Sequence, residues 1–117
     1  MSPGFRSLMW YLLFGTRGGP NRRRILEALT RSPANAHQLA ATLFLDYRTV
    51  RHHLRLLEKN GAVVRPVGEA YSTPYELAPS TAVYLESLPR AAARPPTRTV
   101  PRAVPRARLL RTYGGDP

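Results

Sequence analysis

Apolar residues recur at three- and four-residue intervals over residues 47–59, and the polar residues between them gather on the opposite side. The apolar positions are Val50, Leu54 and Leu57. This spacing is that of an amphipathic helix with one face against a core. Asp46 is a suitable N-cap, and Gly61 is the residue type expected just past a helix end. The pattern therefore predicts a helix over this stretch.

Two more helices are expected before it. The first starts near Pro20, a residue that suits the first helical turn, and ends at Ser32-Pro33. Its apolar stripe is Ile25, Leu26 and Leu29. Arg22 lies one turn before that stripe, so we expect its side chain to point outward. Asn35 begins the second helix, with Gln38 three residues later in a capping-box arrangement. The expected buried positions of this second helix are Leu39, Ala40 and Leu43.

After Gly61 the pattern changes from helical to alternating. Residues 62–67 and 71–77 read as two strands, joined by a turn at 68–70. Pro66 and Pro74 cannot donate ladder hydrogen bonds and belong on edges or at kinks. Three helices followed by a short hairpin make a winged helix-turn-helix fold, mostly α, in which the hairpin is the wing.

The two ends of the chain are different in character. Residues 5–14 are almost wholly apolar but too short to span a bilayer, and no small-x-small cleavage site follows them. We expect an N-terminal helix that forms a homodimer interface; the alternative is that it completes its own core. Near the other end, Ser80 is a suitable cap for one more short helix. The final residues are rich in arginine and proline, and we expect them to be disordered.

Four regions follow from these patterns. They are an apolar helix and Gly-rich turn over 1–19, a winged-helix domain over 20–77, a short helix over 78–88, and a disordered tail over 89–117. The tail is expected to bind phosphates without reading bases; a solvated extension that touches nothing is the alternative.

Charge narrows the choice of partner. The formal net charge is +11 in 117 residues, which favours a polyanion. Arginine greatly outnumbers lysine and suits phosphate and guanine edges, although a GC-rich genome would give the same bias. Cysteine is absent, which excludes disulfides and thiolate metal sites and fits a reducing cytoplasm.

The polar face of residues 47–59 is cationic, and a helix of this kind fits a DNA major groove. A solvated cationic face is the alternative. Arg65 is added from the hairpin, because the wing tip carries Glu69 rather than a base. We assign as candidate DNA-binding residues Arg48, Thr49, Arg51, His52, Arg55 and Arg65. Arginines at these positions could contact guanine edges or phosphates, and both remain open.

Part of the chain resembles a known family. The run LDYRTVRHHLRLLEKNGAVV, followed by a hairpin ending in YEL, is similar to the DNA-binding core of ArsR-type winged helix-turn-helix regulators. The preceding WYLLFGTRGGPNRRRILEAL resembles the opening of uncharacterised archaeal members. The resemblance implies a DNA-binding transcription regulator, usually a homodimer, in which Arg51 and His52 face DNA. Founding members of that family sense metals through cysteines. This chain has no cysteine, so the resemblance gives no effector for it.

Other chemistry finds little support. His52 and His53 diverge by about 100° on a helix and do not form a metal site together. The turn at 15–19 either contacts phosphate through Arg17 or Arg23 or is a plain linker. The acids are scattered, so we expect no enzyme, no cofactor and no membrane partner. Sequence-specific binding of double-stranded DNA is the leading hypothesis. A non-specific architectural protein that binds nucleic acid through its basic tail is the alternative, and a protein-interaction module is the third.

Overall fold

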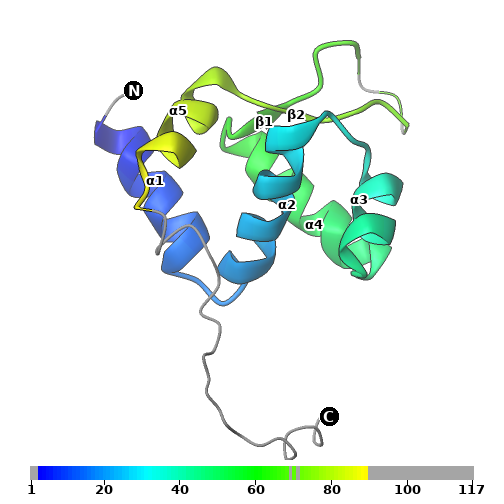
Figure 1. The fold of residues 1–117 in the computed structure, drawn as a ribbon, viewed down its shortest axis with the longest axis horizontal. Coiled ribbons are helices and arrows are strands. Elements are labelled where there is room, and N and C mark those ends of the chain that lie inside the picture. The colour runs from blue at the N-terminus through cyan, green and yellow to red at the C-terminus, as the bar shows by residue number, and fades with distance from the viewer. Residues whose placement is uncertain (1–2, 69, 71, 90–117) are drawn as a thin grey trace, which may run out of the picture.

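The computed structural model describes residues 3–68, 70 and 72–89. The expectations for the tail from residue 90 to residue 117 lie outside the described residues. The fold is mostly helical with one small antiparallel sheet, as the sequence predicted (Figure 1). Its elements are α1 (Pro3–Phe14), α2 (Gly19–Arg31), α3 (Ala36–Leu43), α4 (Tyr47–Lys59), β1 (Val63–Val64), β2 (Glu76–Leu77) and α5 (Pro79–Ser87). In Figure 1, α1 and α5 lie at one end and α3 and α4 at the other, with α2 between them.

Local capping signals place the boundaries of α3 and α4. The Asn35 side chain accepts from the Gln38 N–H at 2.9 Å, and the Gln38 side chain accepts from the Asn35 N–H at 2.8 Å, which confirms the capping box. Phe44 ends α3 in the left-handed conformation, with φ 56°. Asp46 caps α4 by accepting from the Thr49 N–H at 3.1 Å, and Gly61 follows its end with φ 78°.

Two helix starts differ slightly from the predictions. α2 begins at Gly19, one residue before Pro20, and a side chain at Gly19 would come within 2.4 Å of the Leu13 carbonyl oxygen. α5 begins at Pro79, so Ser80 lies inside the first turn and does not cap it. Ala78 holds the N-cap position and has no polar side-chain atom with which to cap the helix. Pro79 fixes a helical φ at the first position instead.

The wing strands are shorter than the alternating pattern predicted. Val63 pairs with Leu77 and Val64 with Glu76, and the ladder ends there. Tyr75 instead exchanges two backbone hydrogen bonds with Ala34, at 2.8 and 3.2 Å, in the connection between α2 and α3. Pro66 and Pro74 lack the N–H that a longer ladder would use. The predicted strands over 62–67 and 71–77 are therefore too long.

One hydrophobic core joins all the helices. It includes Leu26, Leu39 and Leu54 from the three central helices, all at most 2% exposed, and Tyr84 from α5. The apolar stripe predicted for α2 is buried as expected. In α3, Leu39 and Leu43 are buried and Ala40 is half-buried.

The N-terminal helix contributes to this same core. Met9, Leu12 and Leu13 are buried, and the other large apolar residues of α1 that pack against the core are half-buried. Trp10 and Tyr11 are each 57% exposed. The alternative expectation, that this segment completes its own core, therefore holds for Met9, Leu12 and Leu13, and the dimer interface stays a prediction.

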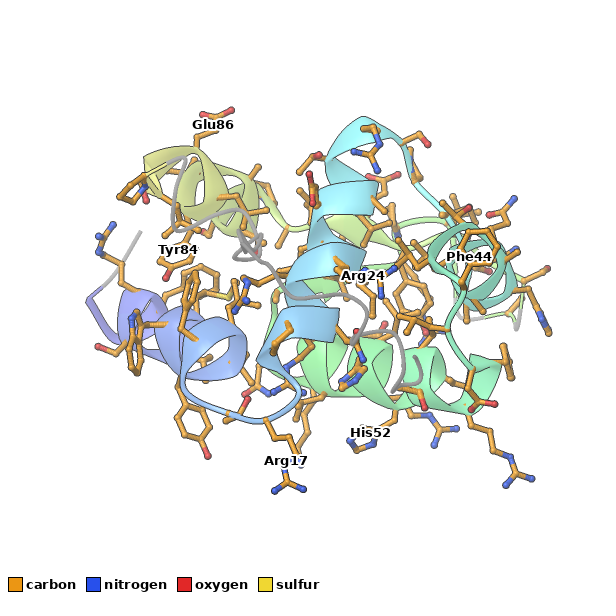
Figure 2. All side chains as sticks on the ribbon, turned by 60° about the horizontal axis from the view of Figure 1, so that its bottom comes forward. Arg17, Arg24, Phe44, His52, Tyr84 and Glu86 are labelled. Carbon is orange, nitrogen blue, oxygen red and sulfur yellow. The ribbon has the colours of Figure 1, made fainter. Side chains whose placement is uncertain are left out.

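Three consecutive arginines of α2 bind carbonyl groups at the ends of other helices. Arg22 Nε donates to the Leu12 carbonyl at 2.9 Å, Arg23 donates to the Leu13 carbonyl, and Arg24 Nη2 donates to the Leu43 carbonyl at 2.7 Å. Leu12 and Leu13 lie in the last turn of α1, and Leu43 is the last residue of α3, where carbonyls have no partner within the helix. Figure 2 shows Arg24 between α2 and α3.

Candidate nucleic-acid interface

α4 has one buried face and one cationic face, as its sequence predicted. Val50, Leu54 and Leu57 are fully buried. On the other side, Arg48, His52 and Arg55 are exposed and Arg51 is half-buried. These four side chains together line one open concavity of the surface. Figure 2 shows His52 pointing away from the body of the molecule.

Arg51 is oriented by both helices of the helix-turn-helix. Its Nη1 donates to the Tyr47 hydroxyl, one turn earlier on α4, at 3.1 Å. The Tyr47 ring in turn stacks on His37 of α3, with ring centroids 4.2 Å apart and an interplanar angle of 12°. Sequence reasoning missed Tyr47 and His37. The four-residue spacing of Tyr47 and Arg51 was a usable signal, but the stacking partner comes from another helix.

The structure places the remaining two candidates differently. Thr49 is half-buried, and its backbone N–H completes the cap formed by Asp46. Arg65 follows β1 and makes a bidentate pair with Glu58 of α4, through Nε and Nη2, both at 2.9 Å. Its guanidinium also lies 5.0 Å from the Tyr75 ring centroid. Arg65 therefore has intramolecular partners that tie the wing to α4, and it neutralises the single acid of that helix.

A buried polar cluster lies behind the cationic face. Arg22 is only 4% exposed, contrary to the outward direction expected for it. Its Nη1 donates to His53 Nδ1 at 3.0 Å, and its Nη2 donates to the Thr16 hydroxyl. Burial lowers the pKa of Arg22 below its ordinary value, but an arginine remains charged in a protein. His53 must then be neutral, with its proton on Nε2.

His53 is buried, and its hydrogen-bond partner is the Arg22 side chain. Burial lowers the pKa of His53 below its ordinary value, and the charges of Arg22 and His52 lower this pKa further. A neutral His53 suits the role of acceptor for Arg22. Among the described residues, no group of three or more His, Cys, Asp or Glu could hold a metal ion.

Comparison with known proteins identifies the central part of the chain. A family model described as a helix-turn-helix domain matches residues 19–66, which run from the start of α2 to just past β1. No curated protein matches the chain. No helix in the described part of the chain is both long and apolar enough to cross a membrane. Residues 19–66 are therefore similar to a helix-turn-helix domain, the kind of domain that DNA-binding regulators use.

Proposed function

We propose that this protein is a transcription regulator that binds double-stranded DNA sequence-specifically, with α4 in the major groove. The observation that carries the proposal is the cationic concavity lined by Arg48, Arg51, His52 and Arg55 on the outward face of α4. The helix-turn-helix match supports the same use. A major groove about 12 Å wide admits an α-helix with its side chains.

The side chains of the cationic face have different roles in DNA binding, which depend on how strongly each is restrained by its neighbours. Arg51 reads a base edge, because its hydrogen bond to Tyr47 limits the directions that its guanidinium takes. Arg48 and Arg55 are exposed on either side of it and bind phosphates or further base edges. Thr49 and Arg65 stay in the proposed interface as flanking contacts.

The quaternary structure is part of the proposal. The resemblance to ArsR-type regulators covers about residues 8–77, and those regulators are usually homodimers. We propose a homodimer built on α1, with help from α5, that spaces two α4 helices about one DNA turn apart. The exposed side chains of Trp10 and Tyr11 on α1 and Val83 on α5 support this surface.

The test is selection of bound sequences from a pool of random DNA duplexes. The full chain should enrich one motif, and the same motif should emerge when residues 90–117 are removed. Recovery of unrelated sequences by the full chain would instead indicate a non-specific nucleic-acid-binding protein. An enriched motif that changes on removal of the tail would show that the tail, and not α4 alone, reads bases.

A further inference from the structure

The turn between α1 and α2, residues 15–18, packs directly against α4. A Cβ atom added at Gly18 would lie 2.8 Å from His53 Cε1 and 2.6 Å from Arg22 Nη1. A side chain at position 18 would have to displace the side chains of Arg22 and His53, so the turn lies directly against a side chain from the middle of α4. His53 is the immediate neighbour of His52, which belongs to the cationic concavity.

The same turn is held in place by hydrogen bonds. The Gly15 N–H donates to the Tyr11 carbonyl at 3.0 Å, and the Gly19 N–H donates to the Thr16 carbonyl at 3.0 Å. Arg22 binds the Leu12 carbonyl, the Thr16 hydroxyl and His53 Nδ1 at once. The guanidinium of Arg22 therefore joins the end of α1, the turn and α4 into one unit.

The side chain of Arg17 projects into solvent from this turn. It is exposed, and no hydrogen bond or ion pair links it to another residue that the structure describes. Figure 2 shows Arg17 and His52 projecting on the same side of the molecule. The contact between Gly18 and His53 brings their two segments together in space. A cation lying beside a cationic helix face, without a carboxylate partner, is placed for a shared polyanion.

We infer that the α1–α2 turn is a second DNA-contacting element, in which Arg17 binds a backbone phosphate beside the groove occupied by α4. This inference rests on the proposed function, because α4 sets where the DNA lies. A phosphate is the expected ligand because Arg17 comes from a turn at the side of α4 and not from the helix that enters the groove. Its guanidinium binds a phosphate through two parallel hydrogen bonds.

The experiment compares Arg17→Gln with Arg31→Gln over a series of salt concentrations. Both arginines are exposed and both substitutions remove one charge, but Arg31 is at the opposite end of α2. Each variant is titrated with the selected duplex and with a random-sequence duplex. Arg17→Gln should weaken both complexes by the same factor, roughly five- to tenfold near 0.1 M salt, and reduce the log–log salt slope by about 0.9. Arg31→Gln should leave the slope unchanged.

An Arg51→Ala variant measured in parallel separates the two claims. If Arg51→Ala weakens specific binding while Arg17→Gln behaves like Arg31→Gln, the inference about the turn is wrong and the proposed function stands. If Arg51→Ala also leaves binding unchanged, the proposed function itself is contradicted, and with it the inference that depends on it. A shift in the preferred sequence on Arg17→Gln would overturn the phosphate assignment, because it would mean that Arg17 reads bases.

Discussion

At the scale of single residues, location decides what each arginine does. Arg22, Arg23 and Arg24 donate to carbonyl groups of other helices, whereas Arg48 and Arg55 face solvent. The helical period predicted the second group because it concerns one helix only. It could not predict the burial of Arg22, whose partners lie 6, 10 and 31 residues away along the chain. The net charge therefore overstates the charge that is available to DNA.

The burial of Arg22 predicts a large loss of stability on substitution. Arg22→Met keeps much of the side-chain volume but leaves the Leu12 carbonyl and His53 Nδ1 without their donor. We expect a loss of at least about 2 kcal/mol in the free energy of unfolding, because buried acceptors without partners are costly. In thermal melting this is a drop of roughly 8 °C or more. Arg31→Met, on the exposed end of the same helix, is the control; an equal effect of both would contradict the network.

His53 predicts how stability changes with pH. Its folded-state pKa lies below the ordinary value, so the unfolded chain binds this proton more readily. Neutral His53 contributes fully to the free energy of unfolding above its ordinary pKa of about 6.5. This contribution is lost as the pH falls toward the lowered pKa of the folded state. His53→Gln keeps an acceptor for Arg22 and cannot titrate. Between about pH 7.5 and pH 5.5 the melting temperature of the wild type should fall more steeply than that of His53→Gln. Parallel curves would show that His53 does not titrate against Arg22.

At the scale of elements, the helices could be predicted and the wing only in outline. Asn35 and Asp46 mark helix starts through contacts three residues away, so the signal lies within a short window. The length of the wing strands depends on Ala34, which takes the hydrogen bonds of Tyr75. No local pattern contains that partner. The same reason explains why the stacking of His37 on Tyr47, which orients Arg51, was missed.

The cap of α4 provides a test at this scale. Asp46→Ala should reduce the free energy of unfolding by about 1 kcal/mol, because the Thr49 N–H loses its acceptor. Asp46→Asn should cost little, since asparagine caps helices about as well as aspartate. Chemical denaturation of both variants measures the difference. Equal losses for Ala and Asn would mean that the charge of Asp46, and not its hydrogen bond, stabilises the helix start.

At the scale of the whole molecule, α1 has one buried face and one exposed face. Met9, Leu12 and Leu13 complete the core of the same chain, and Trp10 and Tyr11 remain on the surface. The sequence showed an apolar segment but could not say which of its residues the rest of the fold would cover. The homodimer proposed for this protein therefore depends on the smaller exposed part of α1.

Trp10→Glu tests that dimer. At tens of micromolar, in the range of a weak dissociation constant of about 10 µM, the wild type should sediment as a dimer and Trp10→Glu as a folded monomer. Val67→Glu, at an exposed apolar residue of the wing, adds the same charge and should remain a dimer. A wild type that sediments as a monomer at this concentration would contradict the proposed homodimer.

A comparison of DNA affinities tests whether α4 binds DNA through its outward face. The affinity for the selected duplex is compared between the wild type and a variant with Arg48, Arg51, His52 and Arg55 all replaced by alanine. A variant with Arg6 and Arg31 replaced by alanine serves as the control for charge away from α4. We expect a loss of at least about 100-fold in affinity for the α4 variant, with its melting temperature retained because none of the four residues is fully buried. Unchanged affinity in the folded α4 variant would contradict the claim.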